Sequence, residues 1–333
     1  MMGVLRVAGQ AAGARILGTG VYRPTRVVGN DEICARIDSS DEWIRRRSGI
    51  VSRRFAGEQE TVITMAAEAA RKAVAQAGID PGEVSMVLVA TMSFLEQAPA
   101  AAPRVAALLG ARGAGGLDIS AACSGFSYAL GLADALVRSD QARFVVVAGS
   151  EKMSDIVDPT DRGAAFLFGD GAGAVVVGPS KEPGISAAVW GCDGEQHRLI
   201  AHDRSWLELR GGQGPWPYLR MAGPEVFRWA TRVVPQVGRQ ALEKAGVTVA
   251  DLAAFVPHQA NARIIDAAAR SLGLAAHTVV ARDVESAGNT CAASIPLALD
   301  QLLSRGQVAS GDLALLVGFG AGLTHAAQVV VVP

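Results

Sequence analysis

Charged residues are scarce in this sequence, and long apolar runs are absent. Only 19% of the 333 residues are charged, the formal net charge is −1, and there is no long basic run. Proteins that bind nucleic acid concentrate positive charge, so this composition argues against that class. A membrane-spanning helix needs about 18 or more consecutive apolar residues, and no such run occurs. Residues 1–13 lack an apolar stretch with a cleavage site, so no signal peptide is predicted.

Cysteine is also scarce. The four cysteines are far apart, and no Cys-x-x-Cys pair occurs. This spacing supports neither a disulfide framework nor a zinc site, and it suits a reducing compartment. We therefore expect a cytoplasmic protein without a bound metal ion.

Apolar residues, by contrast, make up half of the sequence. The chain is long enough for two domains or for one double-sized domain. Helix and strand patterns alternate, as in a helix over 61–77 followed by a strand over 84–90. Neighbouring strands are predicted over 164–168 and 172–177, joined by a tight glycine turn at 169–171. The alternation predicts an α/β fold with mainly parallel strands.

The second half of the sequence repeats the first. A helix pattern that ends at Gly78 resembles one that ends at Gly246, 168 residues later. The same separation pairs Cys123 with Cys291, and each cysteine is followed by an apolar helix pattern. We infer two similar α/β halves related by a pseudo-two-fold axis. Loops at equivalent positions in such halves converge on one site near that axis.

The two halves, residues 1–178 and 179–333, would each supply turns to this site. Cys123 lies between an apolar strand and a helix pattern, where the positive end of the helix dipole favours a thiolate. His258 follows a predicted strand, and Asn289 belongs to a Gly-Asn turn. A thiolate beside a histidine suits covalent catalysis. The histidine and the amide can both donate hydrogen bonds to a carbonyl oxygen, which stabilises an enolate.

Simpler interpretations compete for each of these residues. A buried cysteine is more often structural than reactive, and a Gly-Asn pair is more often only a turn. The repeat favours the functional interpretation for Cys123, whereas we assign Cys291 to packing and no function to Cys34 or Cys192. The backbone N–H of Cys123 and the turn at 320–321 (Gly320 and Ala321) are predicted to form an oxyanion hole.

Motifs along nearly the whole chain resemble those of the β-ketoacyl-acyl-carrier-protein synthase III family of the thiolase superfamily. The most specific are Ala-Ala-Cys-Ser-Gly-Phe at 121–126 and Val-Pro-His-Gln-Ala-Asn at 256–261. The other matching segments are 40–44, 47–50, 158–163, 168–174, 288–290 and 318–322. Asn289 fits this family or the related plant-type polyketide synthases, whereas thiolases use a second cysteine and elongating ketosynthases a second histidine. The resemblance implies a thiolase-like fold with five layers, αβαβα.

The resemblance also implies a condensing acyltransferase. Cys123 would take an acyl group from an acyl-coenzyme A. His258 and Asn289 would then hold the thioester carbonyl of malonyl-acyl-carrier protein while CO2 leaves, and the carbanion would attack the acyl group. The β-ketoacyl product would prime polyketide or specialised fatty-acid biosynthesis. Coenzyme A thioester is a substrate here, so no cofactor is implied, and a homodimer is expected.

By the same resemblance, Trp43 would stack on the adenine of coenzyme A. Arg47 and Arg162 would lie near its base or phosphates, since fixed guanidinium groups suit a phosphate. Asn261 would line the pantetheine tunnel.

Two further expectations concern the carrier protein and the acyl chain. Arg263 and Arg270 are candidates for docking an acidic carrier protein. Housekeeping members of the family usually carry an aromatic residue just before the proline at 99, and this sequence has Ala98 there. We therefore hypothesise a roomier pocket and a starter larger than acetyl.

Two other functions stay open. An acyltransferase on the same scaffold would pass the Cys123-bound acyl group to a hydroxyl or amine acceptor without decarboxylation. A non-catalytic partner subunit would be expected to lack the nucleophile, and Cys123 is present.

Overall fold

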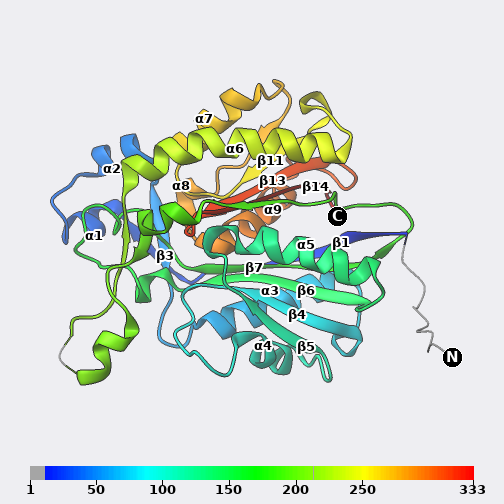
Figure 1. The fold of residues 1–333 in the computed structure, drawn as a ribbon, viewed down its shortest axis with the longest axis horizontal. Coiled ribbons are helices and arrows are strands. Elements are labelled where there is room, and N and C mark those ends of the chain that lie inside the picture. The colour runs from blue at the N-terminus through cyan, green and yellow to red at the C-terminus, as the bar shows by residue number, and fades with distance from the viewer. Residues whose placement is uncertain (1–11, 213) are drawn as a thin grey trace.

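The computed structural model describes residues 12–212 and 214–333 (Figure 1). The first eleven residues of the segment considered for a signal peptide lie outside this range. Across the part of the chain that is described, none of the helices has both the length and the apolar character required to cross a bilayer.

Two five-stranded sheets form the frame of the molecule, one within residues 13–180 and the other within 189–331. The first has the strand order β1 (Gly13–Tyr22), β7 (Gly171–Ser180), β6 (Phe144–Glu151), β4 (Val84–Ala90), β5 (Gly115–Ile119). The second has the order β8 (Val189–Cys192), β14 (Thr324–Val331), β13 (Leu313–Gly320), β11 (Ala254–Pro257), β12 (Val279–Val280). The two orders are equivalent, strand by strand, which agrees with the inferred duplication.

Each sheet is mixed, so the prediction of mainly parallel strands was wrong. In both sheets the first two pairings are antiparallel and the last two are parallel. The cause is the connections: β6 leads to β7, and β13 leads to β14, without a crossover helix between them. Neighbouring strands joined in this way pair antiparallel.

Helices complete a five-layered αβαβα arrangement, as expected for the thiolase-like fold (Figure 1). The outer layers are α3 (Val62–Ala77) with α4 (Ala101–Leu109), and α6 (Gly223–Ala245) with α7 (Ala262–Leu272). The central layer consists of α5 (Gly125–Arg138) and α9 (Ser294–Ser304). Leu130 of α5 and Leu299 of α9 belong to one buried cluster with Val147 of β6 and Leu316 of β13. The central helices therefore pack between the two sheets.

The predicted separation of 168 residues holds for Gly78 and Gly246, which both end helices in a left-handed conformation, but not for the cysteine turns. Ala122 and Cys291 both have left-handed backbone angles, with φ of 44° and 47°. Each begins a 3-10 turn, Ala122–Ser124 and Cys291–Ala293, that leads into a central helix. These positions are 169 residues apart, not 168. Cys123 therefore corresponds to Ala292, and its predicted pairing with Cys291 was wrong by one position.

Residues 164–168 form a buried turn, so the predicted strand and hairpin there were wrong. The backbone N–H of Ala165 bonds to the carbonyl of Asp161 at 2.8 Å, and the segment packs in a buried cluster. A short apolar run indicates burial but does not by itself distinguish a strand from other buried backbone. The glycines that follow serve close packing: a Cβ on Gly169 would lie 2.2 Å from the carbonyl oxygen of Ala287.

The remaining elements gather mainly where β4, β6, β11 and β13 end. They include α1 (Asn30–Cys34), α2 (Asp41–Ser48) and β3 (Ser52–Phe55), at the left in Figure 1. The others are β2 (Arg26–Gly29), β9 (Ile200–His202), β10 (Leu219–Met221) and α8 (Val284–Ala287). Loops from both halves meet beneath them.

Candidate active site

Cys123 lies in the 3-10 turn between β5 and α5 and is 8% exposed. The Ser124 hydroxyl, which bonds to the Ala121 carbonyl at 2.7 Å, holds this turn in place. β13 approaches closely: a Cβ at Gly320 would lie 2.6 Å from the Cβ of Cys123 and 2.9 Å from its sulfur. Glycine at 320 is therefore what allows the end of β13 to reach the sulfur.

His258 follows β11 directly and is 2% exposed. Its Nδ1 lies 2.7 Å from the hydroxyl oxygen of Ser294, at the start of α9. Phe319 packs edge-on against the imidazole, with ring centroids 5.1 Å apart. These contacts fix the ring, and the imidazole lies beside the thiol of Cys123. Since Nδ1 is engaged by Ser294, Nε2 is the atom that faces the sulfur.

Asn289 lies between α8 and the turn that begins at Cys291. Its side-chain oxygen accepts the backbone N–H of Cys291 at 2.9 Å. Its backbone N–H bonds to the carbonyl of Leu167 at 2.8 Å. Because the side-chain oxygen is engaged, the amide nitrogen is the atom left to donate into the cavity. Asn289, Cys123 and His258 all line that one cavity.

The surroundings of Cys123 lower the pKa of its thiol well below the usual value. The main cause is a hydrogen bond from the thiol of Cys291, and the His258 imidazole lowers it further, while burial opposes the shift. The pKa of Cys291 is raised, first by burial and then by the neighbouring sulfur. Cys123 is therefore the thiol that ionises, and a thiolate is the nucleophilic form of cysteine.

Three cavities adjoin one another along a path past Cys123. The outer one, of about 260 Å³, shares Met221 and Asn289 with the central cavity that contains the sulfur. The inner cavity, which is the largest of the three at about 790 Å³, shares Met92 and Ala321 with the central cavity. The central cavity has only about 30 Å³, so the three together outline a narrow passage with most of its room on the two sides of the sulfur.

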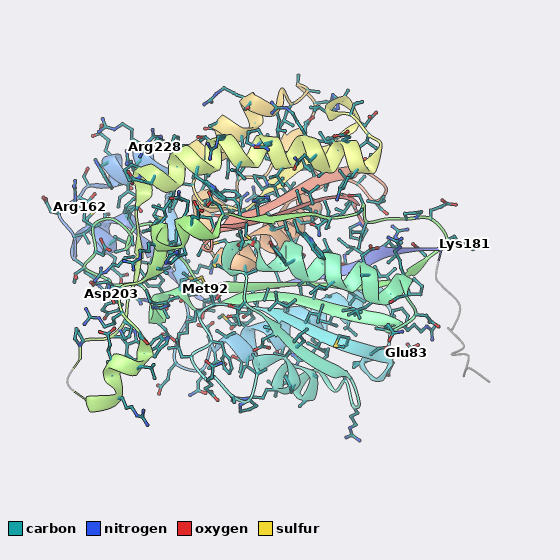
Figure 2. The ribbon with its side chains drawn as sticks, viewed as in Figure 1. Glu83, Met92, Arg162, Lys181, Asp203 and Arg228 are labelled. Carbon is teal, nitrogen blue, oxygen red and sulfur yellow. The ribbon has the colours of Figure 1, made fainter. Side chains whose placement is uncertain are left out.

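The outer cavity contains several of the predicted binding residues. Arg47, Asn261 and Arg263 line it. The side-chain oxygen of Asn261 also caps α7, by accepting the N–H of Ile264 at 3.0 Å. Arg228 of α6 lines the same cavity, and Figure 2 shows it at the same end of the molecule as Arg162. No sequence pattern singled out Arg228 among the many arginines.

Trp43 and Arg162 contact each other outside these cavities. The guanidinium carbon of Arg162 lies 4.9 Å from the centre of the Trp43 ring, which is a cation–π contact. Arg162 also donates a hydrogen bond to the carbonyl of Asp38. Phe166 packs edge-on against Trp43 at 5.1 Å. The pair forms a planar aromatic and cationic surface near the start of α2.

The structure does not place the other two predicted residues in this passage. Ala98 is exposed and is not among the residues that line the three cavities, although Gln97 and Ala100 line the largest. Arg270 is exposed in the last turn of α7. It lies seven residues, or about two turns, after Arg263, so both arginines share one face of the helix.

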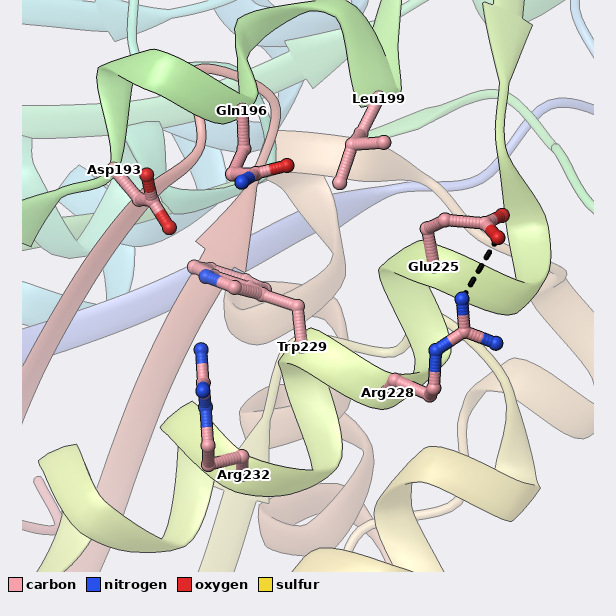
Figure 3. Close-up of a pocket in the computed structure, with 7 residues that line it drawn as sticks. All are labelled: Asp193, Gln196, Leu199, Glu225, Arg228, Trp229 and Arg232. Carbon is pink, nitrogen blue, oxygen red and sulfur yellow. Dashed lines mark hydrogen bonds and ion pairs between the residues drawn. The ribbon is translucent and has the colours of Figure 1, made fainter.

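A fourth cavity, which shares Arg228 with the outer one, lies between α6 and the 3-10 segment Gly194–Leu199 (Figure 3). Its lining residues are Asp193, Gln196, Leu199, Glu225, Arg228, Trp229 and Arg232. Arg228 pairs with Glu225 at 2.8 Å, so charges of opposite sign meet there. None of the residues predicted from the sequence lines this cavity, and we assign it no function.

Comparisons with known proteins identify a family of relatives. Residues 117–194 match the family model of 3-oxoacyl-[acyl-carrier-protein] synthase III, and residues 242–332 match the model of its C-terminal part. The β-ketoacyl-[acyl-carrier-protein] synthase III of Mycobacteroides abscessus is 52% identical, over 96% of this chain and 94% of that protein. That of Streptomyces glaucescens is 50% identical over the full length of both.

Solved structures give the same result. The priming β-ketosynthase of a polyketide biosynthetic pathway has a TM-score of 0.96 and 48% identity, covering 99% of this chain and 98% of that one. The 3-oxoacyl-[acyl-carrier-protein] synthase III of Aquifex aeolicus has a TM-score of 0.89 and 42% identity, covering 96% and 100%. The chain therefore belongs to the β-ketoacyl-acyl-carrier-protein synthase III family.

Proposed function

We propose that this protein is a condensing acyltransferase that primes a polyketide or fatty-acid pathway. It takes an acyl group from an acyl-coenzyme A and condenses it with malonyl-acyl-carrier protein. The observation that carries the proposal is the placement of Cys123, a thiol of lowered pKa, with His258 and Asn289 around one cavity in the middle of a passage. The free thiols suit the cytoplasm, and neither step requires a further cofactor.

Acylation is the first step. The thiolate of Cys123 attacks the thioester carbonyl, a new carbon–sulfur bond forms, and the thiolate of coenzyme A leaves. The oxygen of the tetrahedral intermediate becomes negatively charged. The backbone N–H of Cys123 and those of Gly320 and Ala321, which line the same cavity, are the donors that stabilise this charge.

Condensation is the second step. Nε2–H of His258 and the amide of Asn289 bind the thioester oxygen of the malonyl group, which becomes an enolate as CO2 leaves. The Ser294 hydroxyl, 2.7 Å from Nδ1, donates to that nitrogen and so keeps the proton on Nε2. The carbanion then attacks the acyl-Cys123 carbonyl, the carbon–sulfur bond breaks, and the thiolate returns.

The outer end of the passage suits coenzyme A and a carrier protein. An adenine ring stacks on the planar surface of Trp43 and Arg162, and Arg47 lies nearby to meet the phosphates. Asn261 lines the route of the pantetheine arm. Carrier proteins are acidic, so Arg263 and Arg270 provide a docking face on α7.

The inner end of the passage is where a second copy of the chain would close the acyl pocket. β5 is the edge strand of the first sheet, and its Leu117 is 50% exposed. Leu95, 43% exposed, borders the largest cavity. Exposed apolar residues beside a cavity are typical of a protein interface. In a homodimer Ala98 would reach the partner's pocket, and its small side chain would leave room for a long starter.

Acylation by a panel of acyl-coenzyme A thioesters tests this function. Intact mass and peptide mapping should show a chain-dependent adduct on Cys123, absent from the Cys123→Ala variant. Adding malonyl-acyl-carrier protein to the adduct should release CO2 and a β-ketoacyl product. Transfer to a hydroxyl or amine acceptor without CO2 would support the second candidate, which shares the first step. Absence of an adduct with every chain would refute both.

A further inference from the structure

Glu151 ends β6 behind the nucleophile and is completely buried. Its carboxylate accepts the Thr91 hydroxyl at 3.1 Å, the backbone N–H of Met92 at 3.1 Å and both the N–H and the hydroxyl of Ser93. The N–H of Ala292 lies 3.5 Å away. No ion pair to Glu151 is formed within residues 12–212 and 214–333. A buried carboxyl group without a cation is costly to ionise, and the mechanism above gives it no role.

Cys291 connects this carboxyl group to the nucleophile. It is completely buried, the N–H of the next residue lies 3.5 Å from Glu151, and its thiol is within interaction range of both Glu151 and Cys123. Its backbone N–H is held by Asn289, so the left-handed turn fixes its position. A thiol carries a single proton. Cys291 can therefore donate to Glu151 or to Cys123, but not to both at once.

We propose that Glu151 and Cys291 are positioning residues that control the charge on the sulfur of Cys123. When Glu151 is protonated, its O–H donates to the sulfur of Cys291, and the Cys291 proton points to the Cys123 thiolate and stabilises it. When Glu151 is ionised, it accepts the Cys291 proton as a hydrogen bond, and its charge opposes a second negative charge. The two states differ by one proton, which passes to solvent. The inference rests on Cys123 being the nucleophile proposed above.

The electrostatics of the site are consistent with this coupling. Burial raises the pKa of Glu151 to about 7, although its hydrogen bonds act in the opposite direction. A negative charge on Cys123 raises the pKa of Glu151 further. A negative charge on Glu151 acts in the same way on the pKa of Cys123. Groups that interact this strongly titrate as a pair.

Other charged groups near the end of β6 are engaged elsewhere. The ammonium of Lys152 lies 3.2 Å from the carbonyl of Gly57 and 3.7 Å from Asp155. The carboxylate of Asp170 bonds to Ser154. His258 contacts the sulfur of Cys123 and is held by its bond to Ser294. The two thiols are therefore the titratable groups that act on Glu151 directly.

The test is the pH profile of Cys123 alkylation by iodoacetamide, measured on the Cys123 peptide by mass spectrometry. In the unmodified protein the profile should be shallow, because two groups titrate together. Glu151→Gln should give a one-site profile with a lower midpoint, since a neighbouring negative charge is lost. Cys291→Ala should raise the midpoint by about one pH unit, a tenfold change in the ratio of thiolate to thiol. Cys291→Ser should restore it, because a hydroxyl also donates.

The matched control is Asp170→Asn, which neutralises another buried carboxyl group and should leave the profile unchanged. Superimposable profiles for Glu151→Gln and the unmodified protein would overturn the inference, even if the variant loses activity or stability. If Glu151→Gln does not fold, equal midpoints for Cys291→Ala and Cys291→Ser overturn it instead. Acylation of the unmodified protein is measured in parallel: no adduct on Cys123 refutes the proposed function, whereas an adduct with unmoved profiles refutes only this inference.

Discussion

Alanine at position 320 would place a methyl group against the nucleophile. The new Cβ would lie 2.6 Å from the Cβ of Cys123, 2.9 Å from its sulfur and 3.2 Å from its nitrogen. Carbon atoms in contact are normally about 3.5–4.0 Å apart, so the turn or the strand must move by roughly 1 Å. The backbone at 320 is not left-handed, so the effect of Gly320→Ala comes from this contact and not from strain at the substituted residue.

Two consequences follow from a displacement of that size. Overpacking of this kind costs about 1–3 kcal/mol of the free energy of unfolding. A reacting atom misplaced by about 1 Å costs about 100-fold in rate. We therefore expect the Gly320→Ala variant to fold with reduced stability and to form the acyl-Cys123 adduct about 100-fold more slowly.

The assay is single-turnover acylation, with the adduct quantified by mass, beside a urea unfolding curve. Gly194→Ala is the control, because a Cβ there would meet nothing within 4 Å, the backbone is not left-handed and the residue is exposed. The control should keep both the rate and the stability of the unmodified protein. If Gly320→Ala is folded and acylates at the unmodified rate, Gly320 does not set the position of the sulfur.

Three further changes test other parts of the site. Ser294→Ala removes the partner of Nδ1 and should slow CO2 release about tenfold or more, with acylation much less affected; equal losses in both steps would contradict the role given to His258. Trp43→Ala should raise KM for acyl-coenzyme A about three- to tenfold at unchanged kcat, because about 0.5–1.5 kcal/mol of stacking is lost. Arg162→Ala should raise KM as well. Unchanged KM values in both variants would show that neither residue binds the coenzyme. Ala98→Phe should shorten the acyl chains accepted, and an unchanged chain preference in competition assays would refute the pocket hypothesis.

The layered fold could be predicted because it follows from local periodicity. The strand over 84–90 was predicted with the observed bounds of β4, and the repeat indicated two similar halves. Residues 164–168 were assigned wrongly, since their apolar character reports burial and their turn depends on bonds such as that from Ala165 to Asp161. The antiparallel pairings were also missed, because they depend on how β6 and β7 are connected.

The site was only partly predictable. Cys123, His258 and Asn289 could be proposed because turns from both repeats were expected to converge, and the structure places all three around one cavity. Glu151 could not be proposed: it ends an apolar strand, and its burial results from contacts with 91–93 and 292, distant in the sequence. Ser294 resembles any polar residue that begins a helix until the structure places it against His258.

The one-residue shift in the repeat explains how two similar turns perform different tasks. In the first turn the left-handed residue is Ala122, and the cysteine, Cys123, comes one position later. In the second turn the left-handed residue is itself the cysteine, Cys291. One residue along a helical turn rotates a side chain by about 100–120°. The two sulfurs therefore meet and share a hydrogen bond instead of occupying equivalent places. Ala292 stands at the nucleophile position of the second half, so the second turn carries no nucleophile of its own and supports that of the first.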